Sequence, residues 1–218
     1  MIVMDKRDRL VLLVIPLLFT MSAVMGHGFF FRAGVSLSCA AIVWLTVGRE
    51  IGQTKWWVIA GLVVSVIGDW FMVHSNLMLG IGVFFIAHAC FCVFCLLNGR
   101  IHRGLLFGLL TYYLAFFFVV LQIPQPALFA AVFAYLLMSC VSLSAAAGLR
   151  LPAMVRGTYV IGIALFVFSD TLIALRLFAE YRDLNFLVLP TYFASHMVIT
   201  LALVLMSVVF ECQSKVAK

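Results

Sequence analysis

Charged side chains are scarce in this sequence. Asp, Glu, Lys and Arg make up 10% of its 218 residues, whereas 66% are hydrophobic and the mean hydropathy is +1.23. Soluble domains contain about 25% charged and about 45 to 50% apolar residues, so the composition excludes that class. The apolar runs are continuous rather than alternating, which argues against a transmembrane β-barrel. Helices satisfy every backbone polar group within lipid, so the sequence predicts an all-α, multi-pass membrane protein.

Eight apolar segments have the length of about 20 residues that crosses a bilayer as a helix. They lie at residues 10–26, 31–48, 56–74, 77–98, 104–122, 126–147, 154–178 and 186–210. The first resembles a signal peptide, but no small-x-small cleavage pattern follows it, so we expect a retained helix. The loops are too short to fold separately. We therefore expect one integral membrane domain over residues 1–218, a bundle of eight transmembrane helices.

Basic residues are distributed unevenly between the two sides of this bundle. With eight spans both termini share a side, and that side receives eleven of the fourteen basic residues: Lys6, Arg7, Arg9, Arg49, Lys55, Arg100, Arg103, Arg150, Arg156, Lys215 and Lys218. Only Arg32, Arg176 and Arg182 fall opposite. Cytoplasmic loops collect Lys and Arg, so we expect cytoplasmic termini in a bacterial-type inner membrane. The net charge of +6 then follows from topology, and no nucleic-acid partner is needed to explain it.

Two of the eight acidic residues lie inside apolar segments, Asp69 in SVIGDWF and Asp170 in FVFSDTL. A carboxylate in hydrocarbon is costly, so such residues normally face a polar cavity and carry a function. The alternative is structural, a helix cap or a buried hydrogen bond that fixes packing. At about 1.5 Å per residue both acids come roughly 20 to 24 Å along outward-running spans, in the outer third of the bilayer.

Each acid is followed one helix later by a histidine, His88 in FFIAH and His196 in YFASH. Both histidines are expected near the bilayer middle, where a cavity open to the non-cytoplasmic side would hold all four residues. Tyr192, His196 and Thr200 are spaced at i, i+4 and i+8, a stripe that we expect to face inward. The structural alternative is a neutral histidine that hydrogen-bonds across helices. The recurrence of the two motifs is consistent with a parallel repeat of four plus four helices.

Cys92 and Cys95 form a CxxC on the His88 face of their segment. A metal site is one interpretation of this pair. No second ligand pair accompanies it, and cysteine commonly behaves as a small buried hydrophobe, so we expect neither a metal nor another cofactor.

GDWF with GIGVFFIAH, and FSDTLIALRLF with NFLVLPTYFASH, resemble the YhhN-like lysoplasmalogenase family over most of the chain from Arg32 onward. The resemblance implies eight membrane helices and cleavage of the vinyl ether bond of lysoplasmalogens. The products would be a fatty aldehyde and glycerophosphoethanolamine or glycerophosphocholine. It also implies catalytic roles for Asp69 and Asp170, with His88 and Tyr192 at supporting positions. Two features depart from the family pattern: Arg32-Ala33 replaces a Lys-Pro pair, and His196 stands where glutamine is common.

The implied reaction suits a pair of neighbouring buried acids. One carboxyl stays protonated and donates to the alkenyl carbon, while the other is ionised, stabilises the oxocarbenium ion and activates water. Arg32 is a candidate for the lysophospholipid phosphate, because a guanidinium matches phosphate oxygens, and its alternative is an interfacial snorkelling arginine.

Two other classes of function stay open from sequence. In a zinc-dependent lipid hydrolase, Asp69, His88, Asp170 and His196 would bind the metal that activates water. In a proton-coupled transporter or lipid carrier, the paired acids would relay protons between alternating states.

Overall fold

The computed structural model describes residues 6–26, 28–48, 53–121 and 123–216. The basic residues Arg49 and Lys218 lie outside the described residues, as do the side chains of Lys6, Arg7 and Lys215. Within the described ranges the chain is helical with short turns, as the sequence predicts. The helices are α1 (Lys6–Val11), α2 (Val14–Val24), α3 (Gly28–Thr46), α4 (Lys55–Val73), α5 (Leu77–Leu97), α6 (Arg103–Val120), α7 (Pro126–Ala147), α8 (Ala153–Phe178), the 3-10 turn η2 (Asn185–Leu187) and α9 (Val188–Val216).

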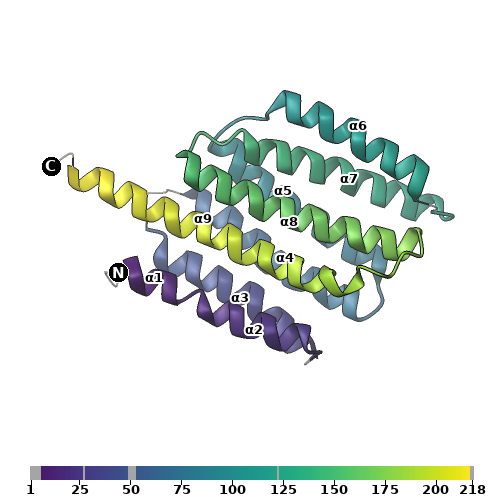
Figure 1. Ribbon diagram of the computed structural model, residues 1–218, viewed down its shortest axis with the longest axis horizontal. Coiled ribbons are helices and arrows are strands. Elements are labelled where there is room, and N and C mark those ends of the chain that lie inside the picture. The colour runs from purple at the N-terminus through teal and green to yellow at the C-terminus, as the bar shows by residue number, and fades with distance from the viewer. Residues whose placement is uncertain (1–5, 27, 49–52, 122, 217–218) are drawn as a thin grey trace.

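Among the described residues, seven helices, α3 to α9, are long and apolar enough to cross a membrane. They correspond to seven of the eight predicted spans, so these spans are confirmed at the level of length and composition. The predicted orientation, with cytoplasmic termini, stays a prediction. The described ends of the chain do lie at the same end of the bundle (Figure 1), as an even number of crossings requires.

The first predicted span differs from the others because it is interrupted. Residues 10–26 were expected to form one helix, whereas the structure has α1 and α2 separated by a turn at Leu12 and Leu13. Pro16 explains the break, since proline has no backbone N–H to donate and its ring clashes with the carbonyl four residues earlier, that of Leu12. The amide of Ile15 bonds the Leu12 carbonyl instead, at 3.1 Å. Neither half alone is long enough to span a bilayer.

The turns fall where polar residues and prolines interrupt the apolar runs. Ser75 adopts a positive φ of 60° after α4, and the side chain of Asn76 accepts a hydrogen bond from the Leu79 amide at the start of α5. The His102 side chain caps α6 in the same way by accepting from Leu105. Pro126 begins α7, where its missing N–H is harmless. These turns lie in the gaps between the predicted spans.

The bundle is organised around two closely packed helix pairs, α4 with α5 and α8 with α9. The α3 helix packs against α4 and α9, and α5 packs against α7, so the two pairs share one core (Figure 1). The α6 helix lies at the edge against α7. Only 6% of the apolar stretch of α6 is buried, against 33 to 56% in the other six candidate spans. The α6 helix is therefore loosely packed and shields one side of α7 and α8 only in part.

Small residues let α4 and α5 approach closely. Gly61, Ser65 and Gly68 are buried on α4 at spacings of i, i+4 and i+7. A Cβ atom on Gly61 would lie 2.7 Å from the ring of Phe91, and one on Gly68 would lie 2.9 Å from the ring of Phe84. These glycines therefore set the position of Phe84, which lies beside the acids described below.

The α5–α6 and α7–α8 turns, at the end of the bundle where α5 and α7 end, are joined by backbone hydrogen bonds. Gly99, between α5 and α6, forms an antiparallel bridge with Leu149, between α7 and α8. The Arg100 amide donates to the Gly148 carbonyl and the Arg150 amide donates to the Asn98 carbonyl. A Cβ atom on Gly148 would collide with the Arg100 carbonyl oxygen, so this junction requires glycine.

Candidate functional site

Asp69 and Asp170 line the same cavity, although 101 positions separate them in the chain. This polar cavity has a volume of about 300 Å³ and lies among α3, α4, α8 and α9, with Phe84 of α5 in its wall. Its lining residues are Arg32, Asp69, Met72, Phe84, Asp170, Ile173, Arg176, Asn185, Val188, Leu189 and Tyr192. Asp69 lies one turn before the end of α4 and Asp170 two turns before the end of α8. The cavity is therefore near one end of the bundle.

Two side chains meet one oxygen of Asp170. Tyr135 of α7 donates its hydroxyl to Oδ2 at 2.7 Å, and His88 Nε2 of α5 lies 3.2 Å from the same atom. His88 is fully buried, and its ring packs against Phe166 with 4.4 Å between centroids. His88 Nδ1 has no hydrogen-bond partner among the described residues. A proton on Nε2 satisfies this contact, because the ring then donates to Oδ2 of Asp170.

Asp69 is held by the last helix. The hydroxyl of Tyr192 donates to its Oδ2 at 3.1 Å, and Arg32 at the start of α3 interacts with it electrostatically. The Tyr192 ring is fixed by edge contacts with Phe84 and Phe166, at 5.8 and 5.4 Å between centroids. The carboxyl thus has one defined hydrogen bond and a nearby cation.

Two of these contacts join the two halves of the chain. The acid of α4 is bonded by Tyr192 of α9, and the acid of α8 is bonded by His88 of α5, whereas Tyr135 of α7 lies in the same half as Asp170. Each half therefore supplies one contact to the acid of the other half. The parallel repeat itself stays a prediction.

His196 lies below the cavity rather than in its wall. Its Nδ1 is 2.9 Å from the hydroxyl of Ser36 on α3, and its ring contacts that of Tyr192 at 4.6 Å between centroids. The stripe of Tyr192, His196 and Thr200 is buried throughout, so the prediction that it faces inward is confirmed. The structure thus brings together Asp69, Asp170, Arg32 and Tyr192 in the cavity. His88 and His196 do not line the cavity themselves. His88 contacts the lining residue Asp170, and His196 contacts the lining residue Tyr192.

Two residues of the site were missed from sequence. Tyr135 bonds Asp170 directly, and Arg176 lines the cavity while its Nη1 donates to Asn185 Oδ1 at 3.0 Å. Signals for both exist in hindsight. Tyr135 is a polar group one turn before Ser139 in an apolar span, and Arg176 is one of only three basic residues on its predicted side.

Metal ligands do not gather at this site. Among the described residues, no group of three His, Cys, Asp or Glu side chains is placed to hold an ion. Cys92 and Cys95 are buried in the core, as the structural interpretation of this CxxC expects. His196, one of the four ligands of the zinc alternative, pairs with Ser36 instead of either acid.

The arrangement is suited to acid and base chemistry on an amphiphile with an anionic group. Two carboxyls, each oriented by hydrogen bonds, share a cavity with two guanidinium groups. A sequence model of the YhhN family matches residues 28–203, which include every residue of the site. The family resemblance seen in the sequence motifs is thereby confirmed. No curated protein and no solved structure matches the chain.

Proposed function

Because the chain belongs to the YhhN family, we propose that it is a lysoplasmalogenase. It hydrolyses the vinyl ether bond of 1-alkenyl-lysophospholipids to a fatty aldehyde and glycerophosphoethanolamine or glycerophosphocholine. The observation that carries this proposal is that Asp69 and Asp170 line one polar cavity within a membrane bundle. Acids in such a position are rarely structural, because an unused carboxyl there is costly.

The reaction begins with proton transfer to the vinyl ether. A protonated carboxyl of the pair donates its proton to the alkenyl carbon that lies away from the ether oxygen. The carbon attached to oxygen then carries the positive charge of an oxocarbenium ion. The second carboxyl, ionised, stabilises this cation across the cavity, a division of labour that carboxylate pairs in other hydrolases use.

Water completes the hydrolysis. The ionised carboxylate accepts a proton from water as the water oxygen bonds to the cationic carbon, which gives a hemiacetal. As the hemiacetal breaks down, the leaving glycerol oxygen takes a proton from the pair and becomes an alcohol, while the hemiacetal hydroxyl gives a proton back to the pair and becomes the carbonyl of the aldehyde. The pair thus holds one proton at the beginning and at the end of a turnover, so protons balance. The two acids act as a unit.

The neighbouring side chains position these groups. His88 and Tyr135 orient Asp170, and Tyr192 orients Asp69. His196 supports the Tyr192 ring from below. Arg32 and Arg176 bind the substrate phosphate, because guanidinium groups pair with phosphate oxygens in a bidentate manner.

The protein's place in the cell is part of the proposal. The distribution of basic residues favours a bacterial-type inner membrane with the cavity open to the non-cytoplasmic side. Lysophospholipid then reaches the site from the outer leaflet.

Fatty aldehyde release tests the proposal. Purified protein in detergent is incubated with 1-alkenyl-lysophospholipid, with and without a chelator, beside the variants Asp69→Asn and Asp170→Asn. Asp183→Asn, in the exposed turn after α8, is the matched control for loss of one acid. We expect chelator-insensitive release by wild type and Asp183→Asn and none by the two site variants. Full activity of either site variant would overturn the acid pair, and loss with chelator would favour the zinc hydrolase.

A further inference from the structure

Asp170 lies where the polar cavity meets two narrow apolar clefts. The inner cleft, between α6, α7 and α8, has a volume of about 50 Å³, and the outer cleft, between α5, α7 and α8, has about 60 Å³. Asp170 lines the polar cavity and both clefts. A ligand that reaches Asp170 from the polar side thus has two apolar spaces ahead of it.

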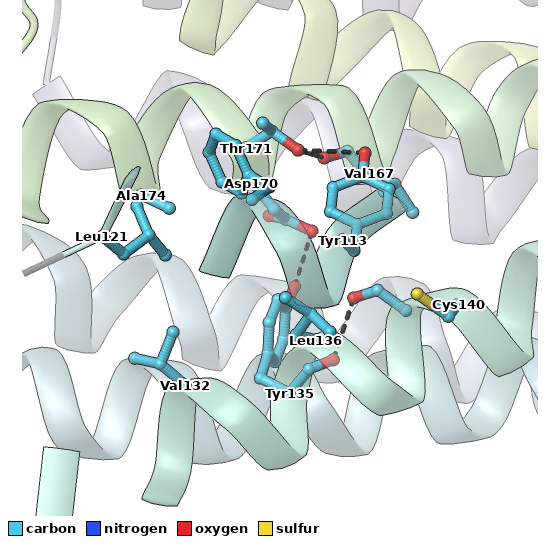
Figure 2. A pocket seen from close by; sticks show the side chains of 12 residues that line it. Tyr113, Leu121, Val132, Tyr135, Leu136, Cys140, Val167, Asp170, Thr171 and Ala174 are labelled. Atoms are coloured by element: carbon cyan, nitrogen blue, oxygen red, sulfur yellow. Dashed lines mark hydrogen bonds between the residues drawn. The ribbon is translucent and has the colours of Figure 1, made fainter. Parts of the chain in front are cut away.

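The inner cleft offers no unused hydroxyl group to a ligand. Of its polar lining residues, Tyr113 bonds Thr171 at 3.2 Å, and Thr171 also donates to the Val167 carbonyl. Tyr135 donates to Asp170, and Ser139 donates to the Tyr135 carbonyl (Figure 2). Because these hydroxyls are engaged with one another, the remaining surface is alkyl, aromatic and thiol. An apolar ligand fits such a wall, whereas a polar ligand would break these bonds.

The inner cleft also points in the direction of a lipid chain. Cys140 and Val167 lie at one end and Ala174 and Leu121 at the other, with Asp170 and Tyr135 between them (Figure 2). Cys140 is 14 residues into α7, about 21 Å along it, which is past the bilayer middle on the side away from the cavity. The line from Arg176 past Asp170 to Cys140 therefore runs from an anion-binding end to an apolar end.

The cover of the inner cleft is thin. Tyr113 and Phe116 of α6 form its lipid-side wall, and α6 is the least buried of the candidate spans. A volume of about 50 Å³ accommodates roughly four water molecules, which corresponds to the first few carbons of a chain.

We propose that the inner cleft binds the hydrocarbon chain of the substrate next to the vinyl ether, with the phosphate at Arg32 and Arg176. This inference rests on the proposed function and adds the location of the chain to it. The cleft then determines which chain lengths are cleaved, and the residues at its closed end, Val167 and Cys140, determine how far a chain reaches.

Substitutions of one residue in opposite directions test the cleft. Val167→Phe fills its closed end and Val167→Ala enlarges it. For Val167→Phe we expect a fall of about tenfold or more in kcat/KM for long-chain alkenyl substrates, with chains of about four carbons nearly unaffected. Val167→Ala should change the ratio of long-chain to short-chain kcat/KM in the opposite direction. If Val167→Phe does not fold, the result for Val167→Ala still decides the test.

Ile81→Phe is the matched control, because Ile81 lines the outer cleft and not the inner one. It should leave the ratio of long-chain to short-chain kcat/KM unchanged. A changed ratio in Ile81→Phe with an unchanged ratio in both Val167 variants would place the chain in the outer cleft and overturn the inference. An unchanged ratio in all three variants would overturn it as well.

Binding of saturated 1-alkyl-lysophospholipids separates this inference from the proposed function, because these lipids have no vinyl ether to cleave. One outcome would be that Val167→Phe binds long-chain lipids more weakly, while wild type releases no aldehyde from any alkenyl substrate. This outcome would support chain binding in the inner cleft and overturn the proposed lysoplasmalogenase activity. The opposite outcome would be normal aldehyde release together with binding that does not depend on chain length in any variant. It would support the lysoplasmalogenase activity and overturn chain binding in the inner cleft.

Discussion

The hydroxyl of Tyr192 donates a hydrogen bond to Oδ2 of Asp69 across 3.1 Å, which joins the last helix of the chain to α4. This contact is almost fully enclosed, since Asp69 and Tyr192 are 6% and 5% exposed.

Tyr192→Phe should lower kcat/KM for aldehyde release by about 10- to 100-fold, the effect of one hydrogen bond to an ionisable group. The aromatic packing with Phe84 and Phe166 is retained, so the folded protein should persist in detergent. Steady-state kinetics beside a thermal melt checks both points. Tyr112→Phe, on the exposed face of α6, is the control and should be unchanged. Unaltered kinetics in Tyr192→Phe would remove this hydrogen bond from the mechanism.

His88 is expected to act on Asp170 through its position. His88→Ala should reduce kcat by about tenfold or more and also lower the melting temperature, because it leaves a void beside Phe166. His88→Gln, whose amide is able to donate to Asp170, should recover part of kcat. Measured kcat and melting temperature for the two variants distinguish positioning from packing. Equal kcat in both variants, with stability alone recovered by glutamine, would assign His88 a packing role.

Arg32 and Arg176 should affect substrate binding more than the chemical step. For Arg32→Ala and Arg176→Ala we expect KM to rise by about tenfold while kcat changes less, since one charge-assisted contact to phosphate is lost. Arg32→Lys keeps the charge but not the bidentate geometry, so its KM should be intermediate. Arg182→Ala, an exposed residue outside the cavity, is the control. A fall in kcat at constant KM would show that the arginines act on the reacting atoms instead.

Gly68→Ala should destabilise the bundle by about 1 to 3 kcal/mol, because the added Cβ meets the Phe84 ring at 2.9 Å. Gly82→Ala, on α5, meets nothing within 4 Å and should be neutral or slightly stabilising through helix propensity. Thermal denaturation in the same detergent compares the two. Since Phe84 lines the polar cavity, Gly68→Ala should also reduce activity. Equal melting temperatures would show that the ring moves aside without cost.

Sequence reasoning identified the acids because a charge in an apolar run is visible without any knowledge of the fold. It did not reveal their partners, since Tyr135 and Asp170 are 35 positions apart and Ser36 and His196 are 160 apart. Such contacts depend on which helices are neighbours. His88 and His196 stand in similar motifs, yet they differ in partner, because the fold places His88 beside Asp170 of α8 and His196 beside Ser36 of α3.

The interruption between α1 and α2 has a different explanation. Its cause, Pro16, is plain in the sequence, but hydropathy averaged over the segment hides a single missing backbone donor. The presence of a helical segment here was therefore predictable from composition, whereas its division into α1 and α2 depended on Pro16 alone.

The bridge between Gly99 and Leu149 holds one end of the bundle together. It joins the α5–α6 and α7–α8 turns at the end of α8 opposite to Asp170. Because no side chain fits at Gly148, the sequence at this junction is constrained although it lies far along the bundle from the acids. Any change in helix spacing that keeps the bridge intact is therefore largest at the end of the bundle that holds Asp69 and Asp170.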